Sequence, residues 1–265
     1  MIRPLVLAAV LAGSGSATAQ ERPWTPLPDP VSATCPGGLC QAEELEAFFQ
    51  ALERPGPVRI LQFGDSHTVG GDITAALLSR LQSRFPGRPI QLDAFGAVGD
   101  TLRGLEARQP LFEGPTPQLV ILAYGTNEGF DDLLDPLAYD RRLRDQIWRI
   151  RSEAPGASLL ILGAPEAMRG EGGGGCANDP DGRWRAPALL AVVRDVQHRV
   201  AAGMGVAYWD WRGRMGGECS AHALTLGPEP LMRGDHVHFT GAGADWIGGL
   251  IFDDLMAAHA RRGGR

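Results

Sequence analysis

The sequence lacks several features that would point to other kinds of protein. It has no long basic run, and its 25 Lys and Arg residues are outnumbered by 31 Asp and Glu residues, giving a formal net charge of −6. This balance argues against a nucleic-acid partner, because such binding depends on clustered positive charge. Beyond the N-terminal region, no stretch is apolar over the roughly 20 residues that a membrane span needs. We therefore expect neither a nucleic-acid-binding protein nor an integral membrane protein.

The first 19 residues are organised like a secretory signal peptide. Met1-Ile2-Arg3 precedes an apolar run over residues 4–13, and small residues follow that end in Ala17-Thr18-Ala19. The apolar run is about half as long as a membrane anchor requires. No cysteine directly follows the small residues, so a lipid anchor is not indicated. The sequence predicts export to a periplasmic or secreted location, with a mature chain that begins at Gln20.

Cysteine is scarce, and its even number is informative in an exported chain. The four cysteines are Cys35, Cys40, Cys176 and Cys219. An oxidising compartment favours two disulfides, for which four cysteines allow three pairings. The local option pairs Cys35 with Cys40 and leaves Cys176 with Cys219, but the sequence does not fix the choice. Neither pair has the spacing of a zinc site, so no metal is expected.

Strand and helix patterns alternate along the chain after residue 57. Apolar runs predict five strands, at residues 58–63, 89–95, 118–124, 158–163 and 206–209. Apolar residues at helical spacing predict helices at 41–52, 72–85, 137–153, 186–203 and 241–260, with a short helix after Thr101. This alternation predicts an α/β fold, a three-layer α/β/α sandwich around a parallel sheet. In such a sheet the functional site lies beyond the carboxyl ends of the strands.

The predicted organisation has three parts. A signal peptide covers residues 1–19, an extended arm and a helix cover 20–57, and one domain covers 58–265. The only stretch of low complexity, the glycine-rich residues 170–175, is expected to be a flexible loop.

Four motifs fall at predicted strand ends or in loops. They are Gly64-Asp65-Ser66-His67-Thr68 after the first strand, residues 96–101 after the second, Tyr124-Gly125-Thr126-Asn127-Glu128 after the third, and residues 234–240 before the last helix. Because carboxyl ends of parallel strands share one edge of a sheet, we expect the first three motifs to meet there.

Together these motifs contain the groups that acyl transfer needs. A serine such as Ser66 needs a base to accept its proton, and histidine is suited to this near neutral pH. The histidine needs an acceptor that fixes its tautomer, and Asp235 lies three residues before His238. A tetrahedral intermediate needs donors for its negative oxygen. The backbone amides of Ser66 and Gly99 and the side-chain amide of Asn127 are the candidates.

Other roles for these residues remain open from the sequence. Asp65 and Ser66 could merely cap a helix. His236 competes with His238 as the base, although spacing favours His238. His67 and Glu128 are candidate substrate contacts, and each could equally pack or hydrogen-bond locally. His222 is expected at the surface.

The four motifs, in this order and on these elements, resemble the four blocks of the SGNH (GDSL) hydrolases. The resemblance covers nearly all of the chain from residue 58 to the last helix. It implies a flavodoxin-like, five-stranded parallel sheet, no cofactor and ester hydrolysis through an acyl-enzyme. It also implies that Ser66 is the nucleophile and an oxyanion donor, that Gly99 and Asn127 are the other donors, that His238 is the base and that Asp235 is its partner.

Fuller motifs resemble the peptidoglycan O-acetylesterase branch of these hydrolases. They are Gly64-Asp65-Ser66-His67-Thr68, Tyr124-Gly125-Thr126-Asn127-Glu128, Tyr208-Trp209-Asp210-Trp211 and Asp235-His236-Val237-His238-Phe239-Thr240. This resemblance implies an O-acetylated glycan substrate. A lipase, a thioesterase, an acetyltransferase or a non-catalytic wall-binding module remains an alternative, and the oligomeric state is not predicted. The glycine-rich loop and Cys176 are not part of the family pattern, so the shape of the pocket stays open.

Overall fold

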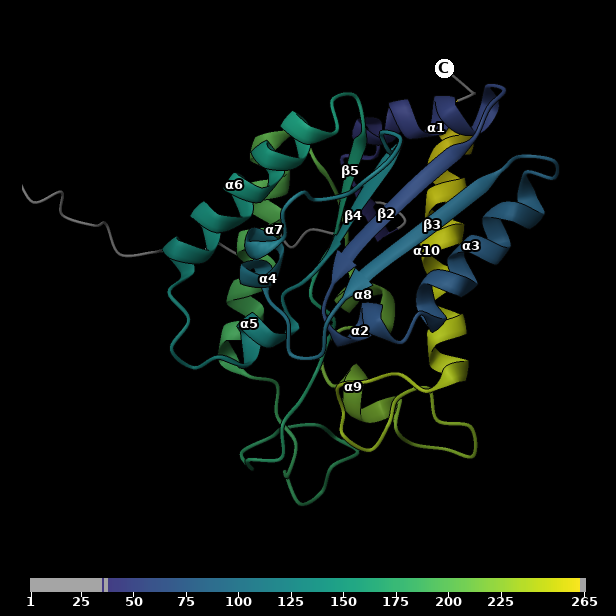
Figure 1. Cartoon of the computed structure of the whole chain (residues 1–265). Coiled ribbons are helices and arrows are strands. Elements are labelled where there is room, and N and C mark those ends of the chain that lie inside the picture. Colours follow the sequence, from purple (N-terminus) through teal and green to yellow (C-terminus); the bar gives the residue numbers. More distant parts are fainter. Residues whose placement is uncertain (1–34, 36–37, 263–265) are drawn as a thin grey trace, which may run out of the picture.

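The computed structural model describes residue 35 and residues 38–262, which form one sheet between two layers of helices (Figure 1). The expected signal peptide and the extended arm up to residue 34 lie outside the described residues. The sheet has the strand order β1-β6-β5-β4-β2-β3. Its strands are β1 Leu39–Cys40, β2 Val58–Gly64, β3 Ile90–Gly96, β4 Leu119–Ala123, β5 Ser158–Leu162 and β6 Ala207–Trp209.

The parallel α/β/α prediction is confirmed, with one strand added. Strands β2 to β6 are all parallel to their neighbours in this group. The sixth strand, β1, pairs antiparallel with β6, so the predicted five-stranded sheet was one strand short. Two residues are too few to show a periodic pattern. The disulfide between Cys35 and Cys40 and a bond from the Asp210 amide to the Gly38 carbonyl (2.8 Å) hold this segment beside β6.

Two groups of helices cover the two faces of the sheet (Figure 1). The helices α1 Glu46–Glu53, α3 Asp72–Arg84 and α10 Gly241–Arg262 pack on one face. The helices α4 Leu102–Ala107, α6 Pro136–Glu153 and α7 Ala188–Met204 pack on the other. Every residue of β4 and β5 is buried, which explains their unbroken apolar sequences.

Four short helices lie outside the helix ranges predicted from the sequence. They are α2 Ser66–Val69, α5 Thr126–Phe130, α8 Trp211–Met215 and α9 Ser220–Ala223. Helices α2, α5 and α8 directly follow the carboxyl ends of β2, β4 and β6. Each is too short for a helical period to show in the sequence. They matter because they place side chains at the edge of the sheet where a site is expected.

Gly64 lets neighbouring segments approach the backbone closely at the end of β2. A Cβ atom at this position would lie 2.6 Å from the Ala123 carbonyl oxygen and 2.2 Å from Oγ1 of Thr68. Only glycine allows β4 and α2 to approach the backbone this closely. The chain therefore enters α2 directly at the carboxyl edge, which puts Ser66 there.

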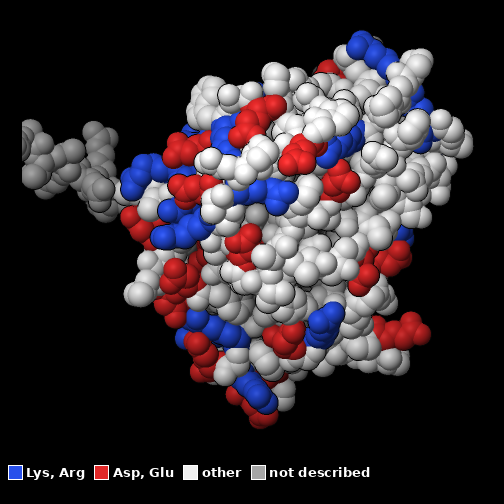
Figure 2. Space-filling view, viewed as in Figure 1, with Lys and Arg blue, Asp and Glu red and all other residues white. Residues whose placement is uncertain are grey.

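Both disulfides of the local pairing form, Cys35 with Cys40 and Cys176 with Cys219. None of the described helices is long and apolar enough to cross a membrane. On the face shown in Figure 2, basic and acidic side chains are interspersed rather than gathered by sign.

Gln197 of α7 joins the ends of two central strands. Its Nε2 donates to the Tyr124 carbonyl (2.7 Å) and to the Tyr139 hydroxyl (3.0 Å), and its Oε1 accepts from the Ala164 amide (2.9 Å). The side chain is only 1% exposed. Water cannot replace these partners, so the bonds stabilise the carboxyl edge more than surface hydrogen bonds would.

We predict that Gln197→Ala lowers the free energy of unfolding by about 3 kcal/mol, because it leaves buried polar partners unsatisfied. Urea unfolding measures this change. The matched control is Arg141→Ala on the exposed side of α6, which should change the free energy by about 0.5 kcal/mol or less. Equal effects of the two variants would contradict this role of Gln197.

Candidate active site

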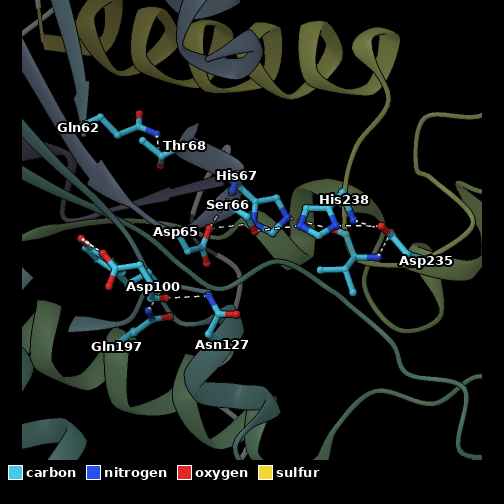
Figure 3. A network of polar contacts seen from close by, with 12 residues as sticks. Gln62, Asp65, Ser66, His67, Thr68, Asp100, Asn127, Gln197, Asp235 and His238 are labelled. Atoms are coloured by element: carbon cyan, nitrogen blue, oxygen red, sulfur yellow. Dashed lines mark hydrogen bonds and ion pairs between the residues drawn. The ribbon is translucent and has the colours of Figure 1, made fainter. Parts of the chain in front are cut away.

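Three residues predicted to act together do meet at the carboxyl edge of the sheet (Figure 3). Ser66 is the first residue of α2, and His238 lies in the loop before α10. Oγ of Ser66 lies 2.9 Å from Nε2 of His238, and Nδ1 of the same ring lies 2.9 Å from Oδ2 of Asp235. The side chains of Asp235 and His238 are 46% and 34% exposed, so this group opens to solvent.

The turn around Asp235 fixes the orientation of the His238 ring. Oδ1 of Asp235 accepts hydrogen bonds from the backbone amides of Val237 and His238, each at 2.9 Å. Burial raises the pKa of this carboxyl, but the two amide bonds and the His238 side chain outweigh burial and hold its pKa below the usual value. The ionised carboxylate accepts from Nδ1–H, which leaves Nε2 to accept the Ser66 proton.

His236, the competing candidate base, faces away from Ser66. Its Nε2 lies 2.9 Å from Nδ1 of His222, and its Nδ1 lies 3.0 Å from the Gly234 carbonyl. Its ring stacks on Trp184 with a centroid separation of 3.6 Å. The structure therefore pairs Ser66 with His238 and uses His236 for packing.

His222 is buried, so the prediction that it lies at the surface was wrong. Its ring stacks on His236, and its Nε2 lies 3.0 Å from the Asn178 carbonyl. Asn178 is close because the disulfide between Cys176 and Cys219 joins its loop to the segment that leads into α9. The burial of His222 depends on the disulfide between Cys219 and Cys176, which are 43 residues apart in the sequence. The residues next to His222 therefore do not predict it.

The glycine-rich stretch is one side of a hydrogen-bonded loop. The amides of Gly172 and Gly174 donate to the carbonyls of Arg183 and Gly182, each at 2.9 Å. Just before this stretch, the Met168 amide donates to the His236 carbonyl (3.0 Å). The loop is thus connected to the segment that carries Asp235 and His238.

Gly99 lies in the exposed loop between β3 and α4. Its φ of +73° is in the left-handed region, although a Cβ atom there would meet nothing within 4 Å. The backbone conformation, rather than space, favours glycine at this position. The candidate donor is therefore presented on an open loop.

The turn after β4 holds this loop at two points. Nδ2 of Asn127 donates to the Asp100 carbonyl (2.7 Å), and this bond uses only one of its two N–H groups. Oε1 of Glu128 accepts from the Leu102 amide (2.9 Å) at the start of α4. Asn127 is thereby placed beside the loop of Gly99 with a second N–H for another acceptor.

Two further candidates are buried. Glu128 is 5% exposed and bonded to α4, and His67 is 8% exposed. Nδ1 of His67 lies 3.0 Å from Oδ1 of Asp65, and Nε2 lies 2.9 Å from the Val237 carbonyl. For both residues the structure favours local hydrogen bonding over substrate contact.

The comparisons with known proteins agree with this geometry. The model of the GDSL-like lipase/acylhydrolase family matches residues 63–246. The chain belongs to this family. No curated protein sequence matches it.

Solved structures of several esterases and other hydrolases share the fold. One, described as a peptidoglycan O-acetylesterase in action, has a TM-score of 0.68 at 20% identity, over 83% of this chain and 96% of the other. An acetylxylan esterase from Geobacillus stearothermophilus has a TM-score of 0.55 at 19% identity, over 75% and 94%. A lipase/acylhydrolase from Enterococcus faecalis has a TM-score of 0.55 at 19% identity, over 77% and 96%.

One cluster of metal-ligating residue types occurs in the described part of this GDSL-family chain. It comprises Cys35, Cys40 and His198. The two sulfur atoms form a disulfide, so they are not thiolate ligands. The expectation of no metal and no cofactor stays a prediction.

The carboxyl of Glu128 gives this fold a testable pH dependence. Burial raises the pKa of Glu128 to about 7, although the hydrogen bond from the Leu102 amide acts to lower this pKa. The unfolded chain loses this proton near pH 4.5, so the folded state binds the extra proton between pH 4.5 and about 7. Stability therefore falls as the pH rises through this window.

We predict that Glu128→Gln removes this fall, because glutamine cannot ionise and still accepts from the Leu102 amide. We compare the free energy of unfolding of the variant with that of wild type at each pH. The variant's advantage over wild type should be larger at pH 8 than at pH 5 by on the order of 3 kcal/mol. Urea unfolding at both pH values measures it, with the exposed Glu113→Gln as control. A stability difference that does not change with pH would count against this prediction.

Proposed function

We propose that this chain is an exported serine esterase that removes O-acetyl groups from a cell-wall polysaccharide, with peptidoglycan as the substrate. The observation that carries the esterase chemistry is the pair of 2.9 Å contacts that link Ser66, His238 and Asp235. An aligned hydroxyl, imidazole and carboxylate activate a serine for attack on a carbonyl.

The reaction has two displacements on the same groups. Oγ of Ser66 attacks the acetyl carbonyl carbon while Nε2 of His238 accepts the hydroxyl proton. The tetrahedral intermediate collapses, the bond to the sugar oxygen breaks, and His238 returns the proton to that oxygen. Water then attacks the acetyl-enzyme in the same way, which releases acetate and restores Ser66. Asp235 stabilises the imidazolium that forms in each half.

Three donors are available for the negative oxygen of both intermediates. They are the Ser66 amide at the start of α2, the Gly99 amide on its open loop and the second N–H of Asn127. Donors held in place before the reaction stabilise this charge without reorganising. The bonds from the β4–α5 turn to Asp100 and Leu102 supply that rigidity.

Several observations support a glycan rather than a long acyl chain as the rest of the substrate. His238 and Asp235 are open to solvent, as a polymer requires. A cavity of about 290 Å³ borders the Gly99 loop, and polar Asp100, Tyr124 and Arg108 line it together with apolar side chains that include Phe63, Phe95 and Leu105. The polar groups of this mixed lining can form hydrogen bonds with sugar hydroxyls. The likeness to a peptidoglycan O-acetylesterase structure supports the same choice.

Export is supported by two features. The leader-like N-terminus precedes the domain, and all four cysteines are in disulfides. Disulfides persist in oxidising compartments. Both agree with a substrate outside the cytoplasm.

The substrate is tested by acetate release. We expect the protein to release acetate from O-acetylated peptidoglycan and not from de-acetylated wall. Acetylated xylan and p-nitrophenyl esters from acetyl to octanoyl are run beside them. Preference for octanoyl esters would contradict the O-acetylesterase assignment. Preference for acetylated xylan would indicate that xylan, and not peptidoglycan, is the polymer. Transfer of acetyl to an added sugar would indicate an acetyltransferase.

We predict that Ser66→Ala lowers kcat on p-nitrophenyl acetate by about 10⁶-fold, because the triad acts as a unit. Asp235→Asn should lower it by about 10⁴-fold, since the ring then adopts the wrong tautomer. Steady-state kinetics measures both, with Ser83→Ala, an exposed serine on α3, as the control. Wild-type activity in Ser66→Ala would contradict the proposed mechanism.

A further inference from the structure

His67 joins the helix of the nucleophile to the loop of the base (Figure 3). It directly follows Ser66, yet its ring points into the protein, where its side chain is 3% exposed. Nδ1 lies 3.0 Å from Oδ1 of Asp65, and Nε2 lies 2.9 Å from the carbonyl of Val237. Val237 is the residue before His238. The ring thus spans the gap between the two catalytic segments.

The chemistry of the two partners fixes the protons on the ring. A carbonyl oxygen only accepts hydrogen bonds, and so does an ionised carboxylate. Oδ1 of Asp65 also accepts from the His67 backbone amide (3.0 Å), which fits a carboxylate. Both ring nitrogens of His67 must then donate. A ring with two N–H groups is an imidazolium and carries a positive charge.

The surroundings favour this charged form. Burial opposes it, but the Asp65 carboxylate and the hydrogen bonds to Asp65 and Val237 outweigh burial and raise the pKa of His67. Burial likewise opposes ionisation of Asp65, yet the imidazolium holds the pKa of Asp65 below its usual value. Ion pairs this deeply buried are sensitive to the loss of either member.

Other titratable groups face the pair from neighbouring elements. Asp235, on the loop before α10, adds to the stabilisation of the positive ring. The His238 ring lies 5.5 Å away, centroid to centroid. The Asp65 carboxylate also contributes to raising the pKa of Glu128 of α5. The remaining ring neighbours, Trp211 and Phe239, are uncharged.

We propose that His67 is a positioning residue that is protonated at neutral pH, holds the Val237 carbonyl and thereby keeps His238 in register with Ser66. This proposal rests on the serine esterase function proposed above. His67 does not touch the reacting atoms and acts through the loop. When the ring loses its Nε2 proton, a bare nitrogen faces the Val237 carbonyl, the link is lost, and His238 shifts from Ser66. Activity therefore declines on the alkaline side as His67 deprotonates.

The first test concerns the alkaline limb of the pH–activity profile, which is the pH range where activity declines as His67 deprotonates. It shifts this limb and keeps the His67 ring. In Asp65→Asn the amide oxygen still accepts, but the charge that stabilises the imidazolium is gone. The limb of kcat/KM on p-nitrophenyl acetate should move to lower pH by about one to three units. The rate at which a fluorophosphonate labels Ser66 should show the same shift. Asp72→Asn, on the exposed first turn of α3, is the control and should not move it. A limb at the wild-type pH in Asp65→Asn overturns the proposal.

The second test removes the charge. Glutamine can donate one bond toward Val237 but carries no charge, so His67→Gln should lower kcat by about 100-fold with a smaller effect on KM. It should also abolish the alkaline limb. His222→Gln is the matched control, since both histidines are 8% exposed. The ring nitrogens of His222 lie within hydrogen-bond distance of His236, on the loop of His238, and of the Asn178 carbonyl, on the loop of Cys176. This control should lose less activity and keep the limb, and equal behaviour of the two variants overturns the proposal.

The third test needs no substrate. Nitrogen-15 NMR of labelled histidine distinguishes protonated from bare ring nitrogens, and the His67 signals are identified by their loss in His67→Gln. We expect both nitrogens of His67 to carry protons at pH 7 in Ser66→Ala protein. A neutral His67 ring overturns the proposal whatever the enzyme hydrolyses. If the imidazolium is present and no ester is turned over, the proposed function fails while the charged link stands.

Discussion

The hydrogen bond between Ser66 and His238 requires two distant parts of the fold to be held in place. It joins residues 172 positions apart, at the end of the first parallel strand and just before the last helix. A bond over such a separation holds only if the sheet fixes one partner and the packed loop fixes the other. Gly64 does the first by letting β4 approach the end of β2. The bonds of Met168 and His67 to the loop contribute to the second.

Much of the fold was predictable because four of the five parallel strands, β2, β4, β5 and β6, are largely buried on both faces, whereas the edge strand β3 is partly exposed. The apolar residues of these segments placed all five parallel strands with ends within one residue of those observed. The meeting of Ser66, Asp235 and His238 was also predictable. Two of these residues are close in sequence, and the sheet topology brings the third to the same edge. Strand β1 and the short helices were missed because they are too short for a pattern to repeat over several periods.

The roles of the supporting residues could not be read from the sequence. His67 and Glu128 looked like candidate substrate contacts because they adjoin Ser66 and Asn127. Their burial favours local hydrogen bonding, and burial depends on partners that are remote in sequence, such as Val237 for His67. His222 was misplaced for the same reason, since the disulfide of Cys176 and Cys219 covers it. Their sequence neighbours gave no signal of these contacts.

The central claim is that Ser66 carries the acyl group during turnover. The most direct measurement is to mix the protein with p-nitrophenyl acetate, quench within the first turnovers and analyse the peptides by mass spectrometry. We expect one acetyl group on the peptide of Ser66, located on that serine by fragmentation. Acetate release with an acetyl group on another residue, and none on Ser66, would contradict the account.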